Sequence, residues 1–143
     1  MSVLPEGYAL SDDPARIDAV AAHAYLTNSY WSPGIPLETV QRAIANSMCV
    51  AVLHEGAQVG MGRVITDRAT FAYLADVHVL EDHRGLGLAS AMISYFHAHA
   101  DLQKLRRWLL GTLDAHALYA QHGWTPLAHA ERAMERMDEG VYA

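Results

Sequence analysis

The chain has 143 residues, of which 52% are hydrophobic and 18% charged, with a formal net charge of −6 and one cysteine. This length corresponds to one domain of about 100–200 residues, and the composition is that of a folded chain rather than a disordered one. The acidic balance argues against nucleic-acid binding, and a lone cysteine excludes a disulfide framework and a cysteine-based zinc site. We therefore expect a single domain over residues 1–143.

The sequence shows no targeting, membrane or metal signal. No apolar run reaches the ~18 residues of a membrane helix, and the N-terminal segment lacks the basic and then apolar stretch of a signal peptide. The nine histidines form no metal motif, since His97 and His99 would point to different sides of a helix and His116 and His122 are too far apart in sequence. We expect a cytoplasmic protein with no metal, no membrane segment and no nucleic-acid partner.

The first part of the chain predicts an antiparallel meander that follows two helices. Ser11 and the acidic residues before Pro14 are typical of a helix start, and apolar runs separated by polar turns indicate strands. The expected elements are a strand at 7–10, a helix from 11 to about 26, a Pro/Gly loop at 27–36, a helix at 37–46, and strands at 48–53, 58–66 and 71–80.

The second part predicts a parallel crossover. Leu86, Ala89, Ile93 and Phe96 recur at helical spacing, and a helix is expected to begin at Asp114 as its cap and to stop at Gly123. A strand–helix–strand unit of this kind is right-handed and parallel. The fold class is therefore α/β with a mixed sheet. The expected elements are a glycine-rich turn at 84–88, a helix at 89–100, a strand at 106–111, a helix at 114–122 and a strand at 124–128.

The glycine-rich turn from Arg84 to Leu88 joins a strand to a helix. Gly85 and Gly87 allow backbone angles that other residues avoid, and the free amides of a helix start bind phosphate groups. A plain turn with a helix cap is the simpler alternative. A dinucleotide fold would need glycine at Ser90 and a position after the first strand, and the Gly-Lys-Ser/Thr of a P-loop is absent.

Two segments together resemble the GNAT superfamily of acyl-CoA-dependent N-acyltransferases. Arg84-Gly85-Leu86-Gly87-Leu88-Ala89 is similar to the R/Q-x-x-G-x-G/A motif of that superfamily, after a long strand and at the start of a helix. The segment 114–124, DAHALYAQHGW, resembles A-x-x-L-Y-x-x-x-G-F, with Trp124 in place of the usual phenylalanine. With the element order, the resemblance covers roughly residues 6–128.

The resemblance implies acetyl-CoA as co-substrate. Its pantetheine arm would lie between the central strand and the next parallel strand, and its pyrophosphate would bind the amides of the glycine-rich turn. Asp114 stands where relatives often carry a polar residue that contacts the cofactor. The expected cofactor-binding residues are Val77, His78, Val79, Arg84, Gly85, Leu86, Gly87, Leu88, Ala89, Ser90, Asp114 and Tyr119.

Tyr119 matches the family position whose hydroxyl protonates the leaving thiolate, so it is the expected general acid. The candidates for the base are Asp76, His78 and Glu81. Strand alternation places Asp76 and His78 on one face and Val77 on the other, unless a bulge intervenes. Some relatives carry a glutamate earlier on this strand, where residues 71–75 have no acid or histidine, so a water relay is an equal alternative.

The acceptor is expected to be a small molecule or exposed group that carries an amine. Tyr30 and Trp31 lie in the Pro/Gly loop that borders the acceptor site in this superfamily, and they are the expected substrate-binding residues. The function implied is N-acetyl transfer from acetyl-CoA. The alternative is a non-catalytic module that binds or senses acyl-CoA. A homodimer is compatible with the resemblance.

Overall fold

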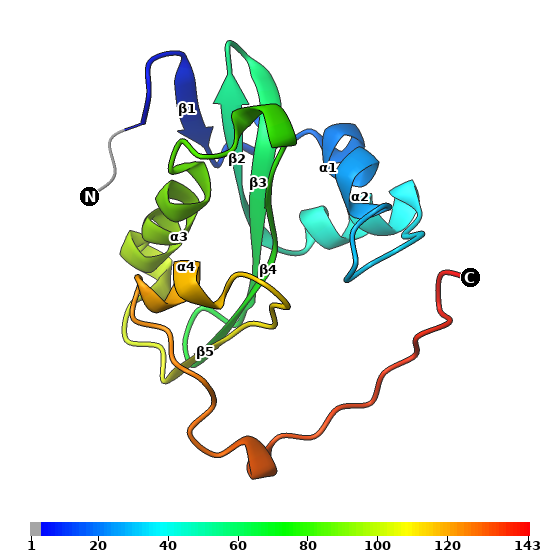
Figure 1. Ribbon diagram of the computed structural model, residues 1–143, viewed down its shortest axis with the longest axis vertical. Coiled ribbons are helices and arrows are strands. Elements are labelled where there is room, and N and C mark those ends of the chain that lie inside the picture. The colour runs from blue at the N-terminus through cyan, green and yellow to red at the C-terminus, as the bar shows by residue number, and fades with distance from the viewer. Residues whose placement is uncertain (1–3) are drawn as a thin grey trace.

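The computed structural model describes residues 4–143, which are built around one five-stranded sheet (Figure 1). Strands β1 to β4 are antiparallel neighbours, and β5 runs parallel to β4 at the edge. The expected mixed sheet, antiparallel first and with a later parallel crossover, is confirmed. In sheet order the strands are β1 (Tyr8–Ser11), β2 (Met48–His54), β3 (Ala57–Thr66), β4 (Phe71–Val79) and β5 (Arg107–Leu109).

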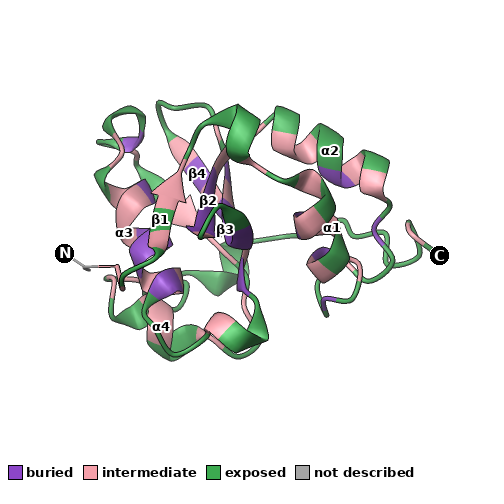
Figure 2. Cartoon of the chain, turned by 90° about the horizontal axis from the view of Figure 1, so that it is seen from above, coloured by how far each residue is buried: buried purple, intermediate pink, exposed green. Residues whose placement is uncertain are grey.

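Helices cover both faces of the sheet, as the view along it shows (Figure 2). Phe96 and Met92 of α3 pack on one face, and Leu26 of α1 and Val40 of α2 pack with Met61 on the other. Burial of these apolar side chains holds the layers together. The helices are α1 (Ala19–Leu26), α2 (Leu37–Ala45), α3 (Leu88–Ala98) and α4 (His116–Ala120), with short 3-10 turns at Pro14–Arg16, Glu81–His83, Ala100–Leu102 and Ala130–Arg132.

Strand β4 contains a bulge at Asp76. Met61 pairs with His78 and Arg63 pairs with Ala75, so two residues of β4 lie opposite the single Gly62. Asp76 takes up the extra residue with a left-handed backbone, φ 59°. Despite this bulge, the side chains of Asp76 and His78 both contact the α1 side, so the expectation that they share a face is confirmed.

The expected helix from residue 11 to 26 is wrong in its first half. The helix begins only at Ala19, after a 3-10 turn and an extended Ile17. Two bonds from Gln58 explain this start: its side chain accepts from the backbone N–H of Asp18 at 2.7 Å and donates to the Asp18 carbonyl at 3.0 Å. Asp18 is thereby fixed as the cap, and its carboxylate accepts from the Ala21 N–H.

Two expectations near the C-terminus are also wrong. Residues 124–128 form no strand, because the Trp124 ring packs into the core and its Nε1–H donates to His97 at 3.2 Å, while residues 125–128 are exposed. Asp114 does not cap α4. The hydroxyl of Thr112 accepts from the Ala115 N–H at 3.0 Å, and α4 begins at His116.

Candidate functional site

The main cavity of the molecule opens where β4 and β5 diverge. The two strands pair only from Phe71 to Tyr73 on β4, and over the rest of β4 no described strand occupies this edge. The cavity has a volume of about 940 Å³. It is lined by α1 and the loop after it, by β4 from Leu74 onward, by the glycine-rich turn with the start of α3, and by the chain from Gly111 to α4.

The glycine-rich turn forms one end of this cavity. Gly85 and Gly87 both line it, and both have left-handed backbones, with φ of +78° and +76°. Gly87 immediately precedes α3, whose first-turn amides belong to Leu88, Ala89 and Ser90. Amides in a first helical turn have no partner within the helix, and the helix dipole adds positive potential there. This end of the cavity can therefore hold a phosphate group.

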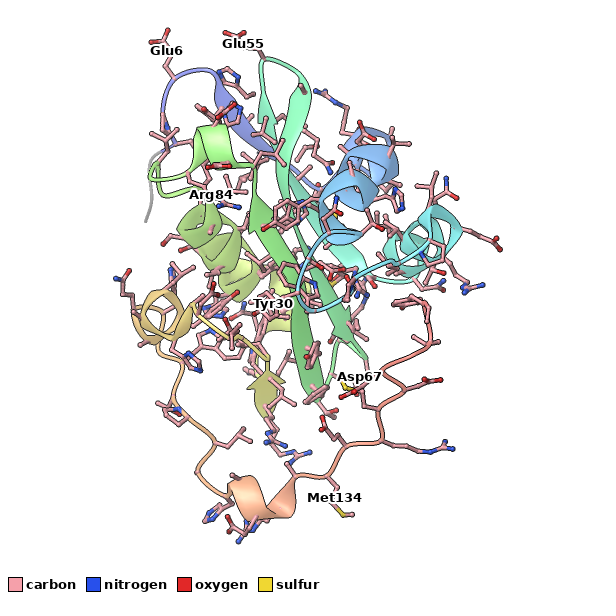
Figure 3. The ribbon with its side chains drawn as sticks, turned by 45° about the vertical axis from the view of Figure 1, so that its right-hand side comes forward. Glu6, Tyr30, Glu55, Asp67, Arg84 and Met134 are labelled. Carbon is pink, nitrogen blue, oxygen red and sulfur yellow. The ribbon has the colours of Figure 1, made fainter. Side chains whose placement is uncertain are left out.

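Arg84 is directed back toward the sheet. Its Nε–H donates to the Val79 carbonyl at 2.9 Å, and its Nη2 donates to the Tyr25 hydroxyl at 3.3 Å. Figure 3 shows Arg84 close to the N-terminal end of α3. The Arg84 side chain therefore links the end of β4 to α1, and its positive charge lies at the cavity wall. Leu86, in contrast, is exposed and does not line the cavity.

Tyr119 enters the cavity from α4. Its ring is half-buried, and the Trp124 ring packs at an angle of 61° with centroids 5.9 Å apart. Burial, with smaller contributions from the nearby Tyr30 and Asp114, raises the pKa of the Tyr119 phenol to about 12. The phenol is therefore protonated at neutral pH and can donate a proton.

The three candidates for the base are placed differently. Asp76 lines the cavity, but its carboxylate accepts from Trp31 Nε1–H at 3.0 Å and from Arg63 Nε–H at 2.8 Å. His78 is 5% exposed, lies behind Tyr25 and is not part of the cavity wall; burial lowers its pKa. Glu81 is exposed on the 3-10 turn after β4 and does not line the cavity.

One part of the cavity wall is aromatic. Tyr30 and Trp31, the expected substrate-binding residues, line the cavity together with Tyr25, which sequence reasoning missed. The only hint in the sequence was that Tyr25 sits near the end of the helix that precedes the loop. The hydroxyl of Tyr30 accepts from the Leu113 N–H at 2.8 Å, so the loop reaches the chain that leaves β5.

A link between α3 and α4 was also missed. The Ser90 hydroxyl, in the first turn of α3, and His122 Nε2, just after α4, are 2.7 Å apart. The contact ties the predicted phosphate site to the segment that carries Tyr119. Asp114, on the segment before α4, also lines the cavity and is exposed.

Over residues 4–143, no three His, Cys, Asp or Glu side chains are grouped so that they could hold a metal ion. None of the helices in this range has the length and apolar character needed to cross a membrane.

The chain belongs to the acetyltransferase (GNAT) family, whose family model matches residues 18–124. A Gibberella zeae protein, described provisionally as an acetyltransferase, is 29% identical over 136 residues, which cover 80% of this chain and 77% of the relative. A crystal structure from Xanthomonas campestris pv. campestris, described provisionally as an acetyltransferase of the GNAT family, has 44% identity and a TM-score of 0.93 over 99% of both chains.

A more distant structure shares the fold. A GNAT family acetyltransferase from Elizabethkingia anophelis, solved with acetyl-CoA bound, has 11% identity and a TM-score of 0.65, and the match covers 96% of this chain and 92% of that one. The superfamily predicted from the two sequence motifs is confirmed.

Proposed function

We propose that this chain transfers an acetyl group from acetyl-CoA directly to a primary amine. The observation that carries the proposal is that one cavity is lined by the glycine-rich turn before α3, the unpaired edge of β4 and Tyr119. These three features correspond to the places where the cofactor phosphates, the pantetheine arm and the leaving thiolate would lie.

Acetyl-CoA would bind mainly through backbone groups. Its pyrophosphate would accept hydrogen bonds from the amides of Leu88, Ala89 and Ser90, and its pantetheine amides would pair with Val77 at the edge of β4, since the Val79 carbonyl already accepts from Arg84. The space fits, because nothing lies within 4 Å of the position that a Cβ would take at Gly85 or Gly87. The acetyl-CoA bound to the Elizabethkingia relative supports this choice of co-substrate.

The transfer itself is a displacement at the thioester carbonyl. The amine nitrogen attacks the carbonyl carbon, a C–N bond forms, the C–S bond breaks and the amine loses a proton. Tyr119 gives its phenolic proton to the departing thiolate and regains one from water. Loss of water from the cavity raises the pKa of the thiol together with that of the phenol, so burial of Tyr119 does not by itself widen the gap in proton affinity between the two groups. The Val79 N–H is our candidate to polarise the carbonyl.

The proton of the amine leaves through water in this proposal. Asp76 already accepts from two N–H donors, which makes it a poor acceptor for a third proton. His78 lies behind Tyr25 and Glu81 lies away from the cavity. A cavity of this size has room for ordered water beside the substrate amine.

The test is thiol release from acetyl-CoA with a panel of amines, run beside Tyr119→Phe. We expect kcat to fall by about 10² or more in the variant with CoA affinity unchanged, since a general acid acts only in the transition state. Tyr95→Phe is the matched control, because the Tyr95 hydroxyl bonds Asp12 outside the cavity. An unchanged rate in Tyr119→Phe across the pH range would overturn the acid role. Acetyl-CoA binding without release for any amine would favour the non-catalytic binding module.

A further inference from the structure

We infer that the acceptor end of the cavity is an aromatic pocket held in shape by Asp76, whose carboxylate is paired with Arg63, and that it takes a primary amine carried on an aromatic or other flat apolar body. This inference rests on the proposed acetyl transfer. Asp76 is a positioning residue in it, since it acts through Trp31.

Three rings form the pocket. The Trp31 ring lies 6.1 Å from that of Tyr25 and 5.0 Å from that of Tyr30, with an interplanar angle of 81° in the second pair. Trp31 is 38% exposed and Tyr30 is 53% exposed, and both line the cavity. Tyr25 is supported from behind by the parallel ring of His78, 4.4 Å away. Flat rings held at fixed angles suit another flat apolar group.

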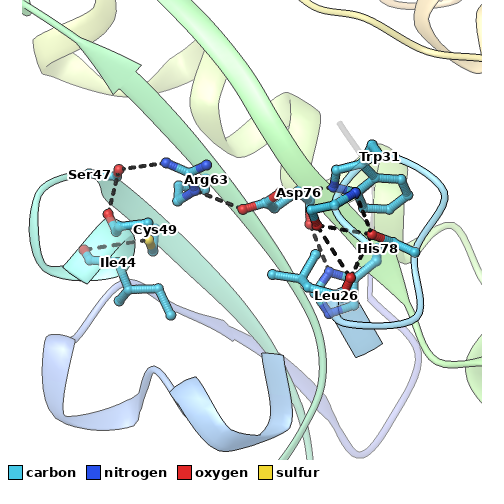
Figure 4. Close-up of polar contacts among 11 residues, drawn as sticks. Leu26, Trp31, Ile44, Ser47, Cys49, Arg63, Asp76 and His78 are labelled. Atoms are coloured by element: carbon cyan, nitrogen blue, oxygen red, sulfur yellow. Dashed lines mark hydrogen bonds and ion pairs between the residues drawn. The ribbon is translucent and has the colours of Figure 1, made fainter. Parts of the chain in front are cut away.

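Asp76 fixes the indole of Trp31 to the sheet. Its Oδ1 accepts from Trp31 Nε1–H at 3.0 Å, and its Oδ2 accepts from Arg63 Nε–H at 2.8 Å (Figure 4). Arg63 Nη1 donates to the Ser47 hydroxyl at 3.1 Å, and that hydroxyl donates to the Ala43 carbonyl at 2.7 Å. The exposed loop that carries Trp31 is thus tied to β4, β3 and the end of α2.

The backbone of Asp76 supports a specific role. A left-handed φ of 59° is unfavourable for a residue with a side chain and persists where surrounding contacts hold it, often at functional sites. The bulge directs the Asp76 carboxylate toward the loop after α1, where it meets Trp31. A glycine would satisfy the backbone at this position but could not hold the indole.

The charges around the pocket decide against a polycationic acceptor. The Asp76 and Arg63 side chains are 12% and 15% exposed and neutralise one another, so this carboxylate is not free to bind an ammonium group. Arg84 adds positive charge beside Tyr25. The other carboxylate that lines the cavity, Asp114, is exposed and lies on the segment before α4. Among the described residues that line the cavity, a polyamine would find one carboxylate outside an ion pair, Asp114, rather than a set of them.

The experiment compares kcat/KM for 2-phenylethylamine and for spermidine with acetyl-CoA as donor. We expect a preference of about tenfold or more for phenylethylamine. Trp31→Ala should raise the KM for phenylethylamine about tenfold and leave acetyl-CoA affinity unchanged. Arg68→Gln is the matched control, because it removes the exposed Arg68–Asp101 ion pair outside the cavity and should change neither constant.

The role of Asp76 is tested by a double-mutant cycle. Trp31→Phe keeps an aromatic ring but loses the N–H, and Asp76→Asn weakens its partner; if they act through one contact, their effects on the amine KM are not additive. Additive effects, or a fall in kcat at constant KM in Asp76→Asn, would overturn the positioning role. Trp31→Phe alone keeps the test valid if Asp76→Asn fails to fold.

The outcomes separate this inference from the proposed function. Failure to bind acetyl-CoA would overturn the proposed function itself. Acetyl-CoA binding with faster turnover of spermidine would overturn only the aromatic acceptor. If neither amine reacts, calorimetry of phenylethylamine with the enzyme–CoA complex decides: binding that is lost in Trp31→Ala supports the pocket, and no binding overturns it.

Discussion

The hydroxyl of Tyr30 accepts a hydrogen bond from the backbone N–H of Leu113 at 2.8 Å and joins two segments that are 83 residues apart in sequence. Tyr30 belongs to the loop after α1, and Leu113 follows β5, so the contact crosses the cavity between its two sides. Figure 3 shows Tyr30 over the middle of the sheet. A ligand that lies between β4 and β5 would occupy the cavity that this contact borders.

Tyr30→Phe should therefore speed the release of CoA. The variant keeps the ring and loses one hydrogen bond worth about 0.5–1.5 kcal/mol, which corresponds to a dissociation rate about 2- to 10-fold higher. Stopped-flow displacement of bound CoA measures this rate. Tyr95→Phe, which loses a tyrosine hydrogen bond outside the cavity, should release CoA at the unaltered rate. Equal rates in the two variants would contradict the bridging role.

Gly87→Ala should weaken CoA binding, whereas Gly56→Ala should not. Both glycines have left-handed backbones, with φ of +76° and +89°, and an added Cβ at either would meet nothing within 4 Å. Alanine costs about 1–2 kcal/mol of backbone strain at each site. Only Gly87 precedes the amides that would hold the phosphates, so calorimetry should find a CoA affinity loss for Gly87→Ala alone. A similar loss for Gly56→Ala would point to global destabilisation instead.

Gly60→Ala should destabilise the sheet. A Cβ at Gly60 would lie 2.7 Å from the backbone carbonyl oxygen of His78, and neither strand can move without losing pairing. We expect a loss of about 1–3 kcal/mol in the free energy of unfolding, measured by chemical denaturation. Gly140→Ala is the control, since its nearest neighbour would be a side-chain atom 3.9 Å away. Wild-type stability in Gly60→Ala would mean that β3 and β4 can separate locally.

Stability should fall as the pH drops below about 6.5. Burial lowers the pKa of His78, so the unfolded chain takes up a proton at a higher pH than the folded chain does. Stability is then fully present above the unfolded pKa and decreases below it. His78→Phe keeps a ring against Tyr25 and should flatten the decrease in denaturation curves between pH 7 and 5. Burial also lowers the pKa of His97, so His97→Phe should remove a further part of the decrease in stability at low pH. An unchanged slope in both variants would contradict this account.

Local sequence patterns were sufficient to predict most elements of the fold. Alternating or continuous apolar runs marked β2, β3 and β4, and helical spacing marked α3 to within a few residues. One motif contains Gly87 and the other contains Tyr119. Each motif is a continuous stretch of sequence, so it could be identified without knowledge of the residues that surround it in the fold. The structure adds that both line one cavity, which the family resemblance had implied.

Features that depend on distant partners could not be predicted. The late start of α1 follows from Gln58, which binds Asp18 across 40 residues. The bulge at Asp76 depends on the register against β3, and the engagement of Asp76 by Trp31 and Arg63 follows from it. A sequence shows which side chains are titratable, but not which of them are already held by a partner.

The divergence of β4 from β5 leaves the sheet one strand short over Leu74 to Val79. A ligand that pairs with this edge would complete the sheet. The backbone groups that bind it are in place only in the folded chain, so binding would stabilise the fold. A ligand at a hundred times its Kd then adds about 2.7 kcal/mol to the free energy of unfolding. The resistance of this protein to proteolysis would therefore rise with the concentration of such a ligand.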